Sequence, residues 1–264
     1  MTPDDESTTR ELARSIRRRA VQMIRPQGFG YLGQALSSAE SIATLYTRHL
    51  RPDVDRFVLS PGHYVISAYS AAAEKGLLSD DDLATYGQDG SALESIGTER
   101  TPLLALTCGS LGQGLSGAAG FALADQLRGR QDRRVYVLVS DGELEEGQVW
   151  EAAMFAAHRG LGSITVLLDA NNSQVDGPVD EITTLEPIAD KWTAFGWHAQ
   201  DVDGHDVVAL DSAFELAAAD PRPSIIIART SITHGIAAIP DDSDGHFIKL
   251  PADLAVVALE ELNA

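Results

Sequence analysis

The sequence predicts an α/β fold in which a parallel sheet is flanked by helices. Two apolar, β-branched runs without charge, Val135–Val139 and Ile164–Leu168, are typical of strands buried on both faces of such a sheet. Between them, Gln148–Arg159 carries apolar residues at helical spacing. With 264 residues and 44% hydrophobic content, the chain is long enough for one large core. We therefore expect a flexible N-terminus over residues 1–10 and a single domain over residues 11–264.

Two helices are predicted before the first strand. Glu11–Ile24 carries an apolar stripe at helical spacing. Its arginines are predicted to form a solvated helix face; they are Arg14, Arg17, Arg18 and Arg19. The second helix is expected over Ser38–Leu50, capped by Ser37 or Ser38.

The remaining elements follow from the same patterns. The segment from Asp55 is strand-like, passes through a Pro-Gly turn to His63, and returns to helix from Val65. Leu106–Ser116 is predicted to be a glycine-rich turn into a helix. Further helices are expected over Leu115–Leu127, Ile188–Phe195, Asp206–Ala219 and Leu254–Leu262, with a buried strand over Ser224–Ala228.

Two oxygen-bearing side chains follow the two central strands. Asp141 comes directly after the first strand and Asn171 shortly after the second. Parallel strands deliver their next residues to the same carboxyl edge of the sheet, where ligands bind. Oxygen ligands suit Mg²⁺, and Gly142 allows the backbone to approach a phosphate. The pattern therefore indicates a metal-bridged diphosphate site.

Composition excludes several other classes of function. The net charge of −19 argues against a nucleic-acid groove, which needs a basic face. No apolar run approaches the roughly 20 residues of a membrane span. The N-terminus is acidic, and the single cysteine, Cys108, excludes an internal disulfide. We expect a cytoplasmic protein that binds neither nucleic acid nor membrane.

The central stretch resembles the thiamine-diphosphate motif, and the closest similarity is to the transketolase family. The resemblance lies in Asp141-Gly142 and in Asn171, thirty positions later, and Ser140 replaces the family's usual glycine. It implies the thiamine-diphosphate-binding (PP domain) fold, with thiamine diphosphate and Mg²⁺, Ca²⁺ or Mn²⁺ as cofactors. Asp141 and Asn171 would bind the metal by their side chains and Ser173 by its carbonyl. Gly142 would contact the cofactor.

Other segments extend the resemblance over residues 10 to 260. Leu59–His63 matches the family's Leu-Ser-Xaa-Gly-His, which makes His63 a cofactor, substrate and catalytic contact. His246, eleven positions after Gly235, would be a second cofactor and catalytic contact. His234 is a nearby competitor, and His205 in an Asp-Gly-His-Asp turn is expected to be structural. The resemblance also assigns cofactor contacts to Gly109, Ser110, Leu111 and Glu146, and places Glu146 and Glu151 near a subunit interface.

The substrate side departs from the family pattern. Tyr31 stands where transketolases have a histidine that touches the sugar, and a second expected histidine is missing from the stretch Ser95 to Glu99. Hydroxyl recognition depends on buried polar partners. The hypothesis is that the small-molecule substrate is a ketol donor or 2-oxo acid with fewer hydroxyls than the usual sugar phosphates.

The resemblance covers only the first third of a full-length transketolase. It implies a split enzyme in which a C-terminal, pyrimidine-domain subunit completes the site, as an α2β2 heterotetramer. The favoured function is transfer of a ketol or acyl unit from a ketose-like or 2-oxo donor to an aldehyde-type acceptor. Two alternatives stay open, half of a 2-oxo-acid decarboxylase or dehydrogenase and a non-catalytic scaffold subunit.

Overall fold

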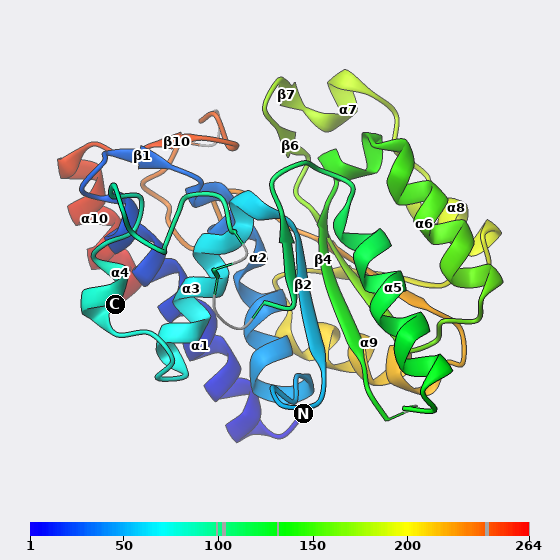
Figure 1. Ribbon diagram of the computed structural model, residues 1–264. Coiled ribbons are helices and arrows are strands. Elements are labelled where there is room, and N and C mark those ends of the chain that lie inside the picture. Colours follow the sequence, from blue (N-terminus) through cyan, green and yellow to red (C-terminus); the bar gives the residue numbers. More distant parts are fainter. Residues whose placement is uncertain (99, 102–103, 131, 241–242, 264) are drawn as a thin grey trace.

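A six-stranded parallel sheet forms the centre of the molecule (Figure 1). The computed structural model describes residues 1–98, 100–101, 104–130, 132–240 and 243–263. The strand order is β3-β2-β4-β5-β9-β8, and every neighbouring pair is parallel. The strands are β2 (Arg56–Pro61), β3 (Leu106–Cys108), β4 (Val135–Ser140), β5 (Ile164–Ala170), β8 (His198–Asp203) and β9 (Ser224–Arg229). The predicted parallel α/β fold is confirmed.

Helices cover both faces of this sheet. One face carries α1 (Pro3–Ile24), α2 (Leu32–Thr44), α3 (Val65–Glu74), α9 (Val207–Ala219) and α10 (Ala252–Asn263), and the other carries α5 (Gly114–Leu127), α6 (Gly147–His158) and α8 (Ile188–Ala194). Successive strand residues alternate between the two cores: Leu138 packs on the α2 side and Val139 on the α6 side. Both faces of the sheet are therefore shielded from water, which explains the unbroken apolar runs in the central strands.

Short elements connect the layers. Two-stranded antiparallel ribbons join β1 (Phe29–Gly30) to β10 (Ile248–Lys249) and β6 (Ser173–Gln174) to β7 (Gly177–Pro178). Single turns form α4 (Asp80–Leu83) and α7 (Val179–Ile182), and a π-helical turn over Leu45–His49 follows α2. The β1–β10 ribbon brings the segment before α2 against the segment before α10, so two distant parts of the chain share one edge of the molecule.

Helix starts are where the structure departs most from the sequence prediction. Helix α1 begins at Pro3, because Thr2 and Asp5 form a reciprocal capping box. Residues 3–10, expected to belong to a flexible N-terminus, are thus helical. Helix α2 begins at Leu32, so Ser37 and Ser38 lie buried within the helix and cap nothing. The predicted helix start at Ser38 was wrong.

Three further details correct the sequence analysis. Arg17 is only 5% exposed, so it does not belong to a solvated helix face. Leu106–Cys108, predicted to be part of a turn, forms the edge strand β3, and His198–Asp203 forms the opposite edge strand β8. Both edge strands are part-exposed and lack a continuous run of apolar residues. For this reason the pattern of buried strands did not predict them.

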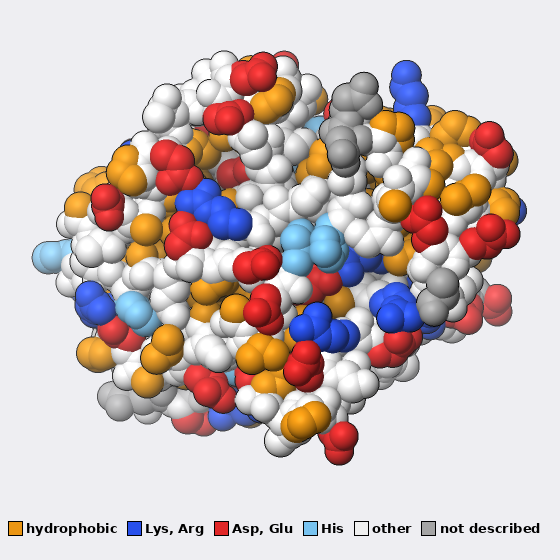
Figure 2. Space-filling view, turned by 180° about the vertical axis from the view of Figure 1, so that it is seen from behind, with side chains coloured by type: hydrophobic (Ala, Val, Ile, Leu, Met, Phe, Trp, Pro, Cys, Tyr) orange, Lys and Arg blue, Asp and Glu red, His pale blue; other side chains and the backbone are white. Residues whose placement is uncertain are grey.

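The surface is strongly mixed in charge. On the face shown in Figure 2, acidic, basic and apolar side chains lie interspersed. Among the helices of the described ranges, none is both long and apolar enough to cross a membrane.

Candidate functional site

The two predicted metal ligands lie at adjacent strand ends. Strand β4 runs beside β5 with Ser140 opposite Asp169, so Asp141 and Asn171 emerge next to each other at the carboxyl edge. Both side chains are buried, at 3% and 8% exposure. The Asp141 carboxylate accepts backbone N–H groups from Asn172 at 2.6 Å and Gly142 at 2.9 Å. The predicted juxtaposition of these two side chains is present in the fold.

The environment of Asp141 favours a cation. Burial and the nearby negative charge of Asp169 raise the pKa of Asp141 to about 7, although the backbone N–H groups act in the opposite direction. Within the described ranges, neither Asp141 nor Asp169 forms an ion pair with lysine or arginine. The Asp141 carboxylate and the Asn171 amide oxygen, with a second buried carboxyl group beside them and no neutralising cation, form a donor set that suits a hard divalent ion. The residues present therefore fit the implied metal.

Asp169 organises this edge, although no sequence pattern singled it out. It is 2% exposed and accepts hydrogen bonds from Ser37 Oγ at 2.5 Å, Tyr64 OH at 2.9 Å and Thr230 Oγ1 at 2.6 Å. It also accepts from Asn171 Nδ2 at 2.9 Å. Because the amide nitrogen points at Asp169, Asn171 Oδ1 faces the other way, where it accepts the N–H of Ser173 at 2.9 Å. Asp169 thus orients a predicted metal ligand, as second-layer partners commonly do.

Glu143 is a second buried acid that sequence reasoning missed. It is fully buried and accepts from Ser60 Oγ at 2.6 Å and Gly112 N–H at 2.7 Å. Burial raises its pKa to about 7, and these hydrogen bonds act against that rise. Glu143 therefore ties the glycine-rich loop after β3 to the turn that carries Asp141.

The three loop residues predicted to contact the cofactor follow β3. Gly109 and Ser110 are exposed and Leu111 is part-buried. The loop is fixed at its far end, where Gly114 N–H donates to Ser60 Oγ at 3.1 Å. Gly109–Leu111 therefore reach solvent at the same edge of the sheet as Asp141.

Three predicted residues meet in an aromatic cluster beside this edge. The ring centroids of His63 and His246 lie 4.9 Å apart, and Tyr31 lies 5.2 Å from His63 and 5.6 Å from His246. Phe247 packs edge-on against Tyr31 at 5.2 Å, with Phe29 a further 5.1 Å away. The fold therefore joins three segments that are far apart in the sequence.

The two histidines of this cluster are held as neutral rings. Burial and the neighbouring His246 lower the pKa of His63 to about 3. Burial lowers the pKa of His246 as well, although Asp244 acts in the opposite direction. Gln34 Nε2 donates to the carbonyl of His246 at 3.1 Å. Neutral imidazoles can accept or relay a proton at neutral pH.

The other predicted site residues lie at the surface or are part-buried near Asn171. Glu146 precedes α6 and Glu151 lies on its first turns, and both are exposed in this chain. Ser173 is part-buried in β6, next to Asn171. The second sugar-site histidine of the family was expected between Ser95 and Glu99. The structure describes Ser95–Thr98, and Glu99 lies outside the described residues.

The fold and this edge define a class of protein. A doubly covered parallel sheet that presents paired oxygen ligands at the carboxyl ends of adjacent strands is the construction of an α/β domain that holds a metal-bridged anionic ligand. Residues 8–259 match the family model described as "Transketolase, thiamine diphosphate binding domain". The chain belongs to the transketolase family.

Similar proteins agree on this family. The chain is 41% identical to a putative uncharacterized transketolase family protein of Sinorhizobium fredii, over 96% of this chain and 95% of that one. It is 39% identical to the 6-deoxy-6-sulfo-D-fructose transketolase subunit SqwG of a Clostridium species, over 95% and 94% of the two chains. The crystal structure of transketolase from Campylobacter jejuni superposes with a TM-score of 0.90 at 26% identity; it covers all of this chain, which spans 43% of that one.

These findings confirm several predictions. The chain is a transketolase-like, thiamine-diphosphate-binding N-terminal subunit, and the enzyme class is that of thiamine-diphosphate-dependent transferases. The chain has the length of a separate subunit among its relatives and less than half the length of the Campylobacter enzyme.

Proposed function

We propose that this chain binds Mg²⁺–thiamine diphosphate and, with a separate pyrimidine-domain subunit, transfers a ketol or acyl unit from a ketose-like or 2-oxo donor to an aldehyde-type acceptor. The observation that carries the proposal is the placement of Asp141 and Asn171 at adjacent strand ends, buried and without a neutralising cation. Asp141 and Asn171 would hold the metal ion by their side chains and Ser173 by its carbonyl; Ca²⁺ or Mn²⁺ would fit the same oxygen donors.

The cofactor supplies the carbanion chemistry, and the protein supplies orientation and electrostatics. Gly142 lies at the turn where a diphosphate would approach the backbone, and Gly109, Ser110 and Leu111 form the exposed loop on the same edge. His63 and His246 would move protons at the reacting end, since burial keeps both rings neutral. Glu146 remains a proposed cofactor-site residue and Glu151 a proposed interface residue.

A partner subunit is the natural completion of this site. The exposure of Gly109 and Ser110 is consistent with a surface that a second chain covers, and the similar Clostridium protein is itself named a subunit. We propose a C-terminal transketolase-like subunit with the pyrimidine domain, in an α2β2 heterotetramer located in the cytoplasm. The single cysteine, Cys108, fits a reducing compartment.

We further propose that the substrate carries fewer hydroxyls than the usual transketolase sugar phosphates. Tyr31 fills the space between His63 and Phe247 with an aromatic ring. Phe29 and Phe247 are 49% and 36% exposed at the rim of this cluster, which gives the approach an apolar surface. Phe29 and Phe247 have no polar side-chain atom, and Tyr31 offers one phenolic OH in place of an imidazole, so this wall offers few partners for sugar hydroxyls.

The test is calorimetry of thiamine diphosphate binding with Mg²⁺, on the chain alone and co-expressed with its partner subunit. We expect binding with the partner, and Asp141→Ala should abolish it. Asp53→Ala is the matched control, because Asp53 is an exposed acid ahead of β2, at the opposite edge of the sheet. Absence of binding in both states would overturn the enzyme proposal and favour the scaffold function.

A further inference from the structure

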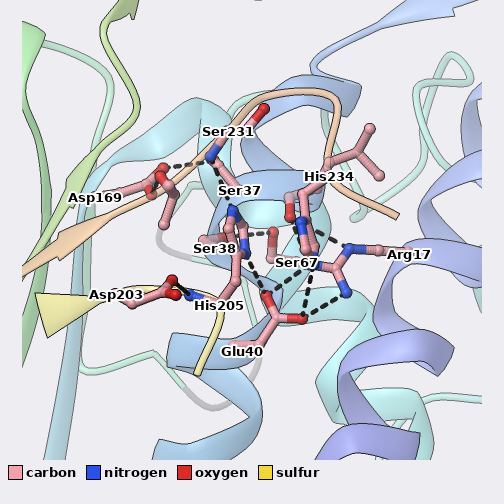
Figure 3. A network of polar contacts seen from close by, with 12 residues as sticks. Arg17, Ser37, Ser38, Glu40, Ser67, Asp169, Asp203, His205, Ser231 and His234 are labelled. Carbon is pink, nitrogen blue, oxygen red and sulfur yellow. Dashed lines mark hydrogen bonds and ion pairs between the residues drawn. The ribbon is translucent and has the colours of Figure 1, made fainter. Parts of the chain in front are cut away.

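A polar cluster, buried at Arg17 and Glu40 and more open at Ser231 and His234, lies beneath the segment that carries His246. It consists of Arg17 on α1, Glu40 on α2, His205 in the turn before α9, and Ser231 and His234 just after β9 (Figure 3). None of these residues has a part in the proposed chemistry. The cluster joins four separate elements at the start of the 230–247 segment, which we call the His246 loop.

The acid and the guanidinium of this cluster are firmly paired. Arg17 Nη1 and Nη2 donate to the two oxygens of Glu40, each at 2.6 Å, and both side chains are at most 7% exposed. Burial by itself would raise the pKa of Glu40, but the hydrogen bond to His205 and the charge of Arg17 lower it to about 2. Glu40 is therefore an ionised, fixed acceptor.

This fixed acceptor determines the tautomer of His205. His205 Nδ1 lies 3.0 Å from Glu40 Oε2, so it carries the proton and donates to the carboxylate. The other nitrogen, Nε2, accepts the backbone N–H of Ser231 at 2.9 Å. His205 thus connects a buried ion pair to the first turn of the His246 loop, and it must present a lone pair at Nε2 to do so.

Side chains of Glu40, His205 and His234 come close enough to suggest a metal site, but the hydrogen bonding argues against it. Their ligand atoms lie within 4.8 Å of one another. However, Arg17 occupies both oxygens of Glu40, and Ser231 occupies Nε2 of His205. A guanidinium at this distance would also repel a cation. His234 instead stacks on His205, with ring centroids 3.6 Å apart.

Thr230, the residue before Ser231, links the His246 loop to the strand ends that carry Asp141 and Asn171. Thr230 Oγ1 donates to Asp169 Oδ1 at 2.6 Å, and Asp169 orients Asn171. Two consecutive residues are therefore held by different anchors, Thr230 by Asp169 and Ser231 by His205. At the far end of the loop, Gln34 and the β1–β10 ribbon hold His246.

We propose that His205, supported by Glu40 and Arg17, is a positioning residue that holds the His246 loop in the place where His246 meets His63. The effect on catalysis rests on the proposed function, whereas the effect on the loop does not. Without the bond to Nε2, the Ser231 N–H loses its side-chain partner, and the loop start keeps the Thr230 anchor but not the one at Ser231.

Two closely matched substitutions test this proposal. His205→Asn retains an amide that reaches Glu40 but cannot reach Ser231, whereas His205→Gln places an amide oxygen near the original Nε2. We expect hydrogen exchange of the amides of residues 231–236 to rise about tenfold in His205→Asn and to stay close to that of the unmodified protein in His205→Gln. In the complex with the partner subunit, His205→Asn should weaken Mg²⁺–thiamine diphosphate binding by about tenfold, and His205→Gln should restore it.

The two readouts separate the outcomes. Unchanged exchange in a folded His205→Asn protein would overturn the anchoring role, whatever the cofactor data show. Increased exchange with unaltered cofactor affinity and kcat would overturn the positioning role for the site. If the unmodified protein binds no cofactor, the proposed function fails, and the exchange comparison still decides whether His205 anchors the loop.

Discussion

Tyr31 is the residue at which we propose that this chain departs from the sugar-site pattern of its family. It precedes α2 and lies between His63, His246 and Phe247, with ring distances of 5.2, 5.6 and 5.2 Å. An aromatic ring in this place packs against the two histidines and does not offer an imidazole nitrogen to a hydroxyl. On this proposal, a single side chain would alter substrate choice while Asp141 and Asn171 stay in place.

Restoring the histidine should shift this preference. We expect Tyr31→His to raise kcat/KM of the reconstituted enzyme for xylulose 5-phosphate with ribose 5-phosphate by about tenfold, the worth of one added hydrogen bond to a buried polar group. Tyr31→Phe is the control and should leave that turnover low. Steady-state kinetics decide the matter: sugar turnover by the unmodified enzyme equal to that of an ordinary transketolase, or no response to Tyr31→His, contradicts the idea.

A residue's role could be predicted when it depended on its neighbours in the sequence, and not when it depended on partners far away in the chain. Asp141 and Asn171 were predictable because each follows a buried strand, and parallel neighbours share an edge. Asp169 and Glu143 were not, because their role comes from partners such as Ser37 and Ser60, more than 80 positions away. Arg17 looked like a surface residue for the same reason, since its partner Glu40 lies on another helix.

At the scale of elements, the close approach of α2 to the His246 loop decides the geometry of the site. A Cβ on Gly33 would clash with the carbonyl oxygen of Gly245 and approach Ile232 Cβ to 3.3 Å. The glycine is therefore what allows the helix start to lie against the loop. Sequence patterns showed the apolar faces of long helices but could not show this contact or the helix start at Leu32. Thr2, Pro3 and Asp5 did carry a capping signal for the start at Pro3.

Two glycine substitutions separate packing from helix propensity. Gly33→Ala should lower the free energy of unfolding by about 1–3 kcal/mol, because the added methyl group overpacks the contact. Gly120→Ala in α5 meets no atom within 4 Å and should raise it by about 0.5–1 kcal/mol. Urea denaturation of the folded chain measures both. Equal effects of the two substitutions would show that Gly33 is tolerated and that the contact can relax.

At the scale of the whole molecule, the fold removes several histidines from water to different degrees. His49, His63, His234 and His246 all have pKa values lowered chiefly by burial. They come from the α2 end, the loop after β2 and the His246 loop. Only the assembled fold buries them, and His234 is buried least, with 41% of its side chain exposed. In the unfolded chain the same rings take up protons near pH 6.5. Stability is therefore linked to pH through the entire tertiary structure.

His63 is the sharpest probe of this linkage. Its pKa falls from 6.5 in the unfolded chain to about 3 in the folded one, so the unfolded state binds more protons between these values. The contribution of His63 to stability is complete above pH 6.5 and is lost as pH falls toward 3.

We expect the decrease in the free energy of unfolding between pH 7 and pH 5 to be smaller in His63→Gln by at most about 2 kcal/mol, which is the free energy of proton uptake by one group over that interval. Urea denaturation at both pH values, with the exposed His158→Gln as control, measures the difference. An unchanged pH dependence in His63→Gln would mean that the ring is hydrated in the folded chain and titrates there as it does in the unfolded chain.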